Sequence, residues 1–403
     1  MQKNRWYVLI LLISFILNAC GSNGSKGTPA DMAGSSFSLS EKIYVHDLFL
    51  SEYLWNDQVS KEIEYENYNT AQSLVNALRV TPPDRWSFTL TRSQYDNMAN
   101  QKTSGFGFAY GEDFTIALVR IGSPSDGTLM RGDKIIKVDS REVTRELIAE
   151  SAKKLNTSVT FQLERAGKMI SVNVTPREYQ FKVSMGKVID QNMSKIGYLR
   201  LDAFTETAVE EFEKIFDTFH NENIDELVID LRYNGGGAVA TTSALLDNII
   251  ADQPEQLQMV LDWNAEFKQK NTQYTFESLD MQDGNELTMH RVFFLVTKDS
   301  ASASEALINA LVPYLGEENV VVIGENTHGK PVGMSGRVYG NNIYFLINFF
   351  VNNRLGDTTS FEGIPVDCQA PDDLSHKLGD ENEAMLKAAL DYVGTNGKSC
   401  VMP

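Results

Sequence analysis

The sequence lacks the patterns that mark nucleic-acid-binding, metal-binding and membrane-spanning proteins. Lysine and arginine number 36 against 54 acidic residues, and the basic residues form no cluster. A net charge of −18 repels phosphate backbones, so we expect no nucleic-acid partner. The five histidines are scattered without metal-ligand spacing, so we expect no metal and no cofactor. The G-x-S-x-G elbow of α/β-hydrolases is also absent.

The longest apolar run lies near the N-terminus and is short. YVLILLISFIL has 11 residues and follows two basic residues, Lys3 and Arg5. A run of this length does not span a bilayer as a helix and is typical of a secretory signal. Cys20, directly after Leu17-Asn18-Ala19, resembles the lipidated cysteine of a bacterial lipobox. This resemblance predicts a lipid-anchored protein of the cell envelope, facing the periplasm or the cell surface; the alternative is an ordinary signal peptide.

Cysteine is scarce, with three residues in the chain. Besides Cys20 there are Cys368 and Cys400. In an oxidising compartment these two are expected to pair and tie the C-terminal tail to the core. Two separate thiols are the alternative.

The N-terminal part contains two predicted helical stretches. Apolar residues recur at helical spacings between Ile43 and Leu54 and again between Ala71 and Leu78. Pro82 and Pro83 end this pattern, because proline lacks the N–H that a helix needs. For the following segment, PPDRWSFTLTRSQYDNM, we expect a loop with aromatic anchors.

Four strands and a helix are predicted in the middle of the chain. The strands are expected at 114–119, 134–138, 159–163 and 170–174, and the helix at 144–154 with Thr144 as its cap. The motif Gly105-Phe106-Gly107-Phe108 and the turn from Ser123 to Ile136 resemble a PDZ domain. The resemblance implies that the first motif binds a peptide carboxylate, since its glycines let successive amides converge on an anion.

From about residue 180 onward, strands and helices alternate, which indicates parallel crossover units. Strands are expected at KIGYLRL, ELVIDL, RVFFLVT, Asn319–Ile323 and NNIYFLINFFVNN, with a possible further strand at 256–261. Helices are expected from a capping box at Thr207 to about His220, up to about Ala251, from Ser304 to Leu315, and from Glu381 to Val393.

Two loops of this second half follow strands and precede helices, which is where open α/β architectures carry reacting groups. The first, DLRYNGGG, ends in glycines whose amides can converge on one spot, as an oxyanion hole requires. The second, SASASE, holds Ser300, Ser302 and Ser304 where free N–H groups at a helix start favour negative charge. A serine there is a candidate nucleophile if a base lies within reach.

Lys330 is the candidate base. It follows Ser302 by 28 residues, after one predicted helix and one returning strand, so the chain comes back beside its starting point. To accept a proton Lys330 must be neutral, which requires burial in a dry site that lowers its pKa. His328, two residues earlier, is the alternative base.

The motifs DLRxNxGG, SASASE and GxxxxGK resemble, in this order, those of the C-terminal processing (tail-specific) serine peptidases. The resemblance implies an α/β fold with a crotonase-like (ClpP/crotonase) core, an inserted PDZ domain and a Ser/Lys dyad. By position, it implies Ser302 as the nucleophile and Lys330 as the general base. It also implies Ala303 and Gly236 or Gly237 as the oxyanion donors.

The resulting prediction is a serine endopeptidase that cleaves proteins or peptides near their C-termini. We expect five segments: a lipoprotein signal peptide (1–19), a flexible tether (20–38), an N-terminal helical region (39–103), a PDZ domain (104–178) and the peptidase core (179–403). Ser300 and Ser304 are expected to pack at the helix start, Glu305 to lie in the first helical turn, and Asp230 and Arg232 to hold their loop.

One position departs from the family pattern. A glutamine often stands four residues after the lysine and orients it, whereas this chain has Met334, which offers no strong hydrogen bond. This departure motivates an alternative function, a catalytically silent, lipid-anchored protein that binds peptides with its PDZ domain and cleft.

Overall fold

The computed structural model describes residues 10–13, 37–191 and 194–395. In these ranges, no helix is both long enough and apolar enough to cross a membrane. Cys20 and Cys400 lie outside the described residues, so the predicted lipidation and the predicted pairing partner stay predictions. Cys368 is disulfide-bonded.

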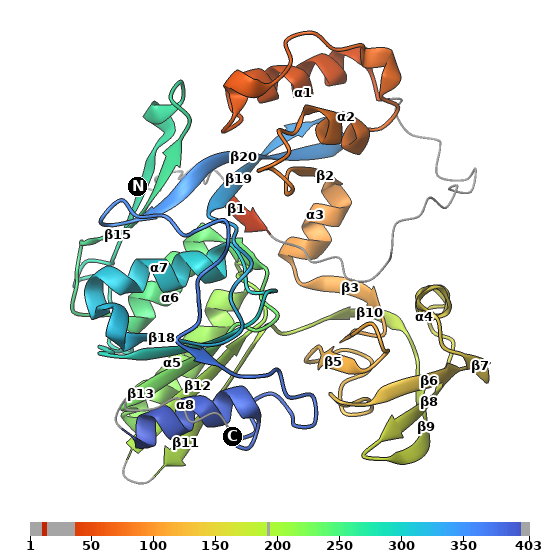
Figure 1. The fold of residues 1–403 in the computed structure, drawn as a ribbon, viewed down its shortest axis with the longest axis vertical. Helices are drawn as coiled ribbons and strands as arrows, with labels where there is room; N and C mark the ends of the chain where they lie inside the picture. The colour runs from red at the N-terminus through yellow and green to blue at the C-terminus, as the bar shows by residue number, and fades with distance from the viewer. Residues whose placement is uncertain (1–9, 14–36, 192–193, 396–403) are drawn as a thin grey trace.

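A six-stranded sheet forms the centre of the second half of the chain (Figure 1). Its first two strands pair antiparallel, and every later pair is parallel. The parallel order confirms the predicted crossover units. In sheet order the strands are β11 (Ser184–Gln191), β12 (Ser194–Leu201), β13 (Glu226–Asp230), β17 (Val292–Val296), β18 (Val320–Gly324) and β21 (Cys368–Gln369).

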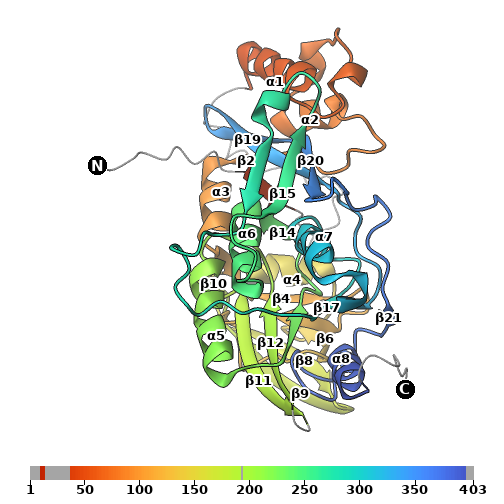
Figure 2. The same ribbon diagram turned by 90° about the vertical axis from the view of Figure 1, so that its left-hand side faces the viewer.

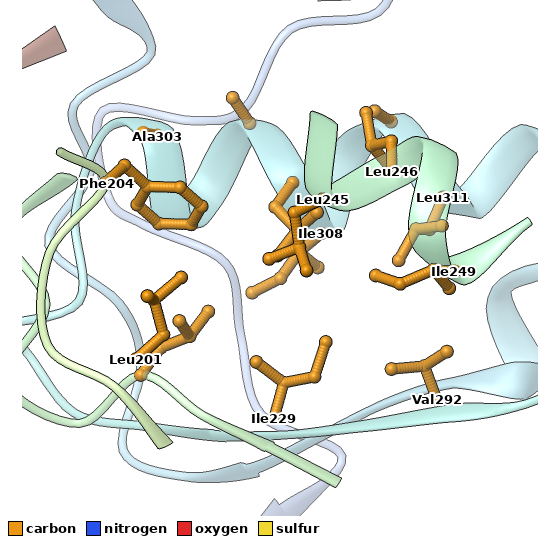
Figure 3. Packing of buried hydrophobic residues seen from close by; sticks show 14 of the residues in the cluster. Leu201, Phe204, Ile229, Leu245, Leu246, Ile249, Val292, Ala303, Ile308 and Leu311 are labelled. Carbon is orange, nitrogen blue, oxygen red and sulfur yellow. The ribbon is translucent and has the colours of Figure 1, made fainter. Parts of the chain in front are cut away.

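Helices cover both faces of this sheet, which explains why its strands are almost continuously apolar. Leu227 and Ile229 face the cluster that contains α5, α6 and α7, whereas Val228 faces α8. Figure 3 shows the first cluster, with Ile229 below side chains of α6 and α7. The helices are α5 (Ala208–Glu222), α6 (Val239–Ile249), α7 (Ala303–Leu315) and α8 (Ala384–Gly394).

The capping box predicted at Thr207 is wrong. Thr207 precedes α5, but its side chain makes no capping hydrogen bond to the helix. Its hydroxyl instead donates to Oε1 of Gln101, a residue more than 100 positions away. The Thr207 hydroxyl thus bonds to a residue distant in the sequence instead of to the first turn of α5. The spacing of residues around Thr207 carries no information about such a distant partner.

A second sheet lies beside the first and reaches the N-terminal helices. Its order is β14-β1-β19-β20-β15-β16, and β2 also pairs with β20. The strands are β1 (Ile10–Ile13), β2 (Phe88–Thr91), β14 (Gly236–Ala238), β15 (Leu257–Trp263), β16 (Thr272–Thr275), β19 (Val332–Tyr339) and β20 (Asn342–Asn353). The long strand predicted at NNIYFLINFFVNN and the possible strand at 256–261 are both confirmed, as β20 and β15.

The N-terminal helices pack on β19 and β20, where they form an apolar cluster around Phe49, Tyr53 and Phe345 (Figure 2). They are α1 (Leu39–Ser51), α2 (Ala71–Leu78) and α3 (Arg92–Ala99). Short 3-10 helices lie at Asn56–Gln58, Tyr65–Asn67, Lys268–Lys270 and Glu317–Asn319.

The segment after the two prolines is more ordered than the predicted loop. Phe88 pairs with Phe345 as β2 joins β20, and α3 follows directly. Thr91 and Gln94 cap α3 reciprocally, each side chain accepting a backbone N–H of the other residue. The expectation of a loop is therefore wrong for residues 88–98, because β2 depends on a partner strand some 250 residues away.

Residues 102–180 form small sheets with one helix and a core of their own. The expected strands and the helix are confirmed to within about two residues, and Thr144 accepts a hydrogen bond from the amide of Leu147, as a cap does. The core gathers around Phe106, Ile135 and Phe161. The elements are β3 (Lys102–Gly105), β4 (Phe108–Tyr110), β5 (Ile116–Val119), β6 (Lys134–Val138), β7 (Arg141–Glu142), α4 (Arg145–Ala152), β8 (Val159–Arg165), β9 (Lys168–Val174) and β10 (Arg177–Gln180).

Candidate active site

The glycine loop and the serine loop meet at the carboxyl ends of two neighbouring parallel strands, β13 and β17. The carbonyl of Asn234 accepts hydrogen bonds from the amide of Ala301 at 3.1 Å and from the Ser304 hydroxyl at 2.9 Å. The Ser300 hydroxyl donates to the carbonyl of Leu231 at 2.8 Å. Ser300 and Ser304 therefore hold the two loops together, in agreement with the packing role expected for them.

Ser302 stands between these two structural serines in an unusual conformation. Its φ of 62° and ψ of −109° are rare for a residue with a side chain. It is 2 % exposed, and among the described residues its hydroxyl has no hydrogen-bond partner. Strained backbone of this kind clusters at functional sites. Of the three serines, Ser302 is thus the one whose hydroxyl remains available.

The glycine loop packs directly against Ser302. A Cβ atom on Gly236 would lie 3.0 Å from Cβ of Ser302 and 3.1 Å from the amide nitrogen of Ala303. The Gly236 amide itself donates to Oδ1 of Asn234 at 2.9 Å. Of the two glycines predicted as alternative oxyanion donors, Gly236 therefore has its amide bonded within the loop, and Gly237 pairs with Leu12 of β1. Ala303 begins α7, where the first amides have no partner within the helix.

Lys330 is buried beside this site, with 1 % of its surface exposed. Burial lowers its pKa to about 7, and the charges of Asp84 and Glu305 oppose that shift. A lysine with this pKa is largely neutral just above pH 7 and can accept a proton. A general base must be neutral to accept a proton, and this pKa meets that condition.

Glu305 joins the serine loop to the lysine loop. Its Oε2 accepts the amide of Ser302 at 2.7 Å and the amide of Lys330 at 2.9 Å. Its Oε1 accepts the amide of Gly329 at 2.7 Å and the hydroxyl of Thr327 at 2.6 Å. Glu305 lies in the first turn of α7 as expected, but its bridge between the two loops was not predicted from the sequence.

Asp230 and Arg232 form a buried ion pair at the base of the glycine loop. Arg232 is fully buried and contacts the carboxylate of Asp230 at 2.6 Å and that of Glu383 at 2.7 Å. The Tyr198 hydroxyl donates to Asp230 at 2.7 Å. These contacts agree with the loop-holding role expected for this pair and extend it to Glu383 at the start of α8.

His328 is poorly placed to act as the base. Its Nε2 lies 3.3 Å from the indole nitrogen of Trp86, which only donates, so Nε2 is the acceptor. Its Nδ1 lies 3.2 Å from the carbonyl of Lys298 and is therefore the protonated nitrogen. Both ring nitrogens are therefore occupied by other groups.

A cleft of about 1010 Å³ runs from the glycine loop to the middle region of the chain. Its walls include Gly237, Phe204, Tyr233, Phe108 and Arg120. The cleft thus connects the glycine loop with strand β4. Its mixed apolar and charged lining suits a polypeptide rather than a small apolar molecule.

The edges of β14 and β19 accept an extended segment between them. Strand β1 pairs antiparallel with both, so that Ile13 lies opposite Gly236 and Leu11 opposite Met334. Main-chain pairing on two sides is the way in which β-strand addition binds peptides. Met334 itself is fully buried in the apolar cluster of the N-terminal helices.

The motif Gly105–Phe108 lies between β3 and β4, far along the chain from Ser302. Gly105 and Gly107 have φ values of 121° and 85°, which side chains rarely adopt. A Cβ on Gly107 would also collide with Ser123 at 2.2 Å. The amides of Phe106 and Gly107 make no hydrogen bond to any described residue.

In the part of the chain that the structure describes, no group of three or more acidic, histidine or cysteine side chains could hold a metal ion.

Two family models match the chain. The model described as "Peptidase family S41" matches residues 195–369, and "Peptidase S41 N-terminal domain" matches residues 42–88. The first range contains the glycine loop, Ser302 and Lys330. The second ends with the segment that contains Asp84 and Trp86.

Curated relatives are moderately similar. The chain is 24 % identical over 340 residues to the tail-specific protease of Haemophilus influenzae, covering 76 % of this chain and 46 % of that protein. It is 24 % identical over 300 residues to the carboxy-terminal processing protease CtpB of Bacillus subtilis, covering 72 % and 58 %. The chain thus spans about half the length of these relatives.

Solved structures share the fold. A putative S41 protease from Bacteroides fragilis superposes with a TM-score of 0.74 at 22 % identity, covering 88 % of this chain and 98 % of that one. The photosystem II D1 C-terminal processing protease superposes with a TM-score of 0.50 at 16 % identity, covering 81 % and 91 %. At these identities the likeness establishes a mixed α/β fold of the S41 type.

Proposed function

Because this chain carries the domains of peptidase family S41, we propose that it is a serine endopeptidase that cleaves polypeptides near their C-termini. Ser302 is the nucleophile, and Lys330 is its general base. The observation that carries the proposal is a pair of hydrogen bonds: one carboxylate oxygen of Glu305 accepts both the Ser302 amide and the Lys330 amide. A strained serine and a buried lysine of pKa about 7 are thereby held in one site.

The chemistry proceeds in two halves. Neutral Lys330 takes the proton of the Ser302 hydroxyl as Oγ bonds to the scissile carbonyl carbon, and the amides of Gly237 and Ala303 stabilise the resulting oxyanion. The Lys330 ammonium then gives its proton to the leaving amine, the C–N bond breaks, and an acyl-enzyme remains. In the second half, water attacks the ester with Lys330 again as base, which releases the new carboxyl end and the Ser302 hydroxyl.

The core of this enzyme is crotonase-like, and residues 104–178 are an inserted PDZ domain. In this assignment the amides of Gly105–Phe108 bind the carboxylate of the substrate tail, and the peptide continues through the cleft to Ser302. The open amides of Phe106 and Gly107 and the cleft between Phe108 and Gly237 support this path. Segment β1 illustrates how an extended chain pairs with both edges of the slot.

The remaining segments serve location and stability. Residues 1–19 are a lipoprotein signal peptide, Cys20 carries the lipid, and the tether to residue 38 holds the enzyme off the membrane in the cell envelope. Cys400 is the disulfide partner of Cys368, which fastens the tail beside β18. The partners of the protein are therefore substrate C-termini and the membrane that holds the anchor.

Cleavage assays with an unstructured protein substrate test the proposal. Ser302→Ala and Lys330→Ala are each expected to abolish cleavage, whereas His328→Ala retains it, because both nitrogens of His328 are bonded elsewhere. Full cleavage by Ser302→Ala would contradict the proposal. Peptide binding without cleavage by the unaltered protein would instead establish the catalytically silent binding protein.

A further inference from the structure

Lys330 is covered by a loop of the N-terminal region that the proposed chemistry does not use. The indole ring of Trp86 lies with its centroid 6.0 Å from Nζ of Lys330. Its nitrogen donates to His328 at 3.3 Å, and its ring stacks on Phe361 with centroids 6.2 Å apart and planes 19° from parallel. Trp86 is therefore held by His328 and Phe361, and the amine of Lys330 lies over its ring.

Asp84 anchors this loop from inside the protein. It is completely buried, and its carboxylate accepts the amide of Trp86 at 2.8 Å, the hydroxyl of Tyr53 at 2.8 Å and the hydroxyl of Ser87 at 2.6 Å. Ser87 in turn accepts the amide of Ile347 on β20 at 3.1 Å. These hydrogen bonds fix the position of the Asp84 carboxylate.

The same region also accounts for the methionine that stands where the family often has glutamine. Met334 packs into the apolar cluster formed by α1, α2 and β20, so this position of β19 offers the lysine no strong hydrogen bond. The loop from Asp84 to Trp86 contacts this part of the chain: Arg85 and Trp86 bond to His328, and Nζ of Lys330 lies over the Trp86 ring.

We propose that Asp84 and Trp86 are positioning residues for the base Lys330. Trp86 keeps water from the amine, while the carboxylate of Asp84 stabilises the ammonium that forms when Lys330 takes the proton of Ser302. The inference rests on the proposed function, since it needs Lys330 to act as a base.

The two residues act on Lys330 with opposite signs. The charged or titratable groups around the lysine are Asp84 and Arg85 on the covering loop, Glu305 on α7, and His328 on its own loop. The carboxylates of Asp84 and Glu305 raise the pKa of Lys330, and burial, to which Trp86 contributes, lowers it by more. Removing the charge of Asp84 therefore lowers the pKa, and opening the site at Trp86 raises it.

The test is the pH dependence of covalent labelling of Ser302 by a fluorophosphonate probe, using the whole mature chain. Labelling needs neutral Lys330, so its rate rises with pH through the pKa of the lysine. Asp84→Asn is expected to move this rise to lower pH by roughly half a unit or more and to slow the plateau rate. Trp86→Ala is expected to move it to higher pH by a similar amount, and Trp86→Phe, which keeps a ring, is expected to move it less.

Glu41→Gln is the matched control. Glu41 is also a buried carboxylate of the N-terminal region, bonded to Tyr344 and Asn342, but it does not act on Lys330. This variant is expected to unfold more easily while its pH midpoint stays in place. The midpoint does not depend on how much of a sample is folded, so partial misfolding of Asp84→Asn does not obscure the result.

The outcomes separate this inference from the proposed function. If the unaltered protein is labelled at Ser302 and needs Lys330, but neither Asp84→Asn nor Trp86→Ala moves the midpoint, the positioning role is overturned. Shifts of both variants in the same direction would overturn it as well. If Asp84→Asn does not fold, the direction of the Trp86→Ala shift alone decides. Absence of any labelling of Ser302 in the unaltered protein would instead overturn the proposed function.

Discussion

The peptidase core and the N-terminal region contribute to the same lysine in different ways. In the core, parallel strands bring the ends of β13 and β17 together, and the residues that hold Ser302 come from the loops directly after them. In the N-terminal region, Asp84 and Trp86 reach Lys330 only because β2 and the helices dock on β20. In the proposed mechanism the core thus supplies the reacting groups, and a distant segment supplies much of the environment of one of them.

The largest effect should come from comparing two serines of the same loop. Ser302→Ala removes the nucleophile and is expected to lower kcat about 10⁴-fold or more. Ser300→Ala removes only the bonds to the carbonyl of Leu231 and the amide of Thr297. It should reduce the free energy of unfolding by about 1–3 kcal/mol and leave the folded enzyme active. Cleavage kinetics and urea unfolding of both variants check this, and equal losses of activity would contradict the division of roles.

Glu305→Gln tests the bridge between the two loops. The carboxylate of Glu305 accepts four hydrogen bonds. In glutamine an NH2 group, which cannot accept a hydrogen bond, replaces one carboxylate oxygen. The loops that carry Ser302 and Lys330 should therefore move apart. A misplacement of about 1 Å costs on the order of 10²-fold in rate. Glu317→Gln, in the first turn of an exposed 3-10 helix, is the control. Steady-state kinetics with kcat unchanged in Glu305→Gln would show that the bridge is dispensable.

Stability should show the cost of the buried lysine. The pKa of Lys330 is about 7 in the folded protein, against an ordinary value of 10.5. Between these values the unfolded chain binds the proton that the folded protein lacks, so this lysine destabilises the fold fully below pH 7, and the penalty fades as pH rises toward 10.5. Lys330→Met should therefore raise the free energy of unfolding at pH 7 by on the order of 4 kcal/mol. Denaturant unfolding at pH 7 and pH 10 checks this; no gain at pH 7 would mean that the lysine is not held neutral.

The middle region should affect substrate capture more than chemistry. If the amides of Gly105–Phe108 bind a terminal carboxylate, amidation of a peptide substrate should raise KM about tenfold and leave kcat within about twofold. Kinetics of one peptide with a free and an amidated C-terminus give the answer. Equal KM values would remove the carboxylate-binding role from this loop.

The smallest effect is expected at the position that departs from the family pattern. Met334→Leu preserves an apolar side chain of similar volume in the N-terminal cluster and should cost less than about 1.5 kcal/mol. Activity should stay near that of the unaltered protein, since the lysine is covered by Trp86 rather than oriented from β19. A large loss of activity together with unchanged stability would mean that Met334 acts on Lys330 directly.

Local patterns predicted most of the core. Buried strands such as β13 and β17 have continuous apolar runs, and the glycine and serine loops follow them, so both the parallel sheet and the candidate residues Ser302 and Lys330 could be identified without coordinates. The choice of Ser302 among the three serines came from the resemblance to the C-terminal processing peptidases, which implies the middle serine by position.

What the sequence did not predict depends on contacts between distant segments. Thr207 bonds to Gln101 rather than capping its helix, β2 exists because β20 accepts it, and the amide of Gly236 is taken by Asn234. Glu305 fitted the pattern of a first-turn glutamate, and nothing in its neighbours marked it as the link to Lys330. Asp84 and Trp86 lie in a segment expected to be a loop, more than 200 residues from the lysine that they cover.

The most direct test of the Ser302/Lys330 assignment is mass spectrometry of the protein after reaction with a fluorophosphonate at a series of pH values. The account predicts a single adduct, on the peptide that contains Ser302, and a labelling rate that rises with pH through about pH 7. In Lys330→Ala the labelling rate should be at background. An adduct on another residue, or a Lys330→Ala variant that labels as fast as the unaltered protein, would contradict it.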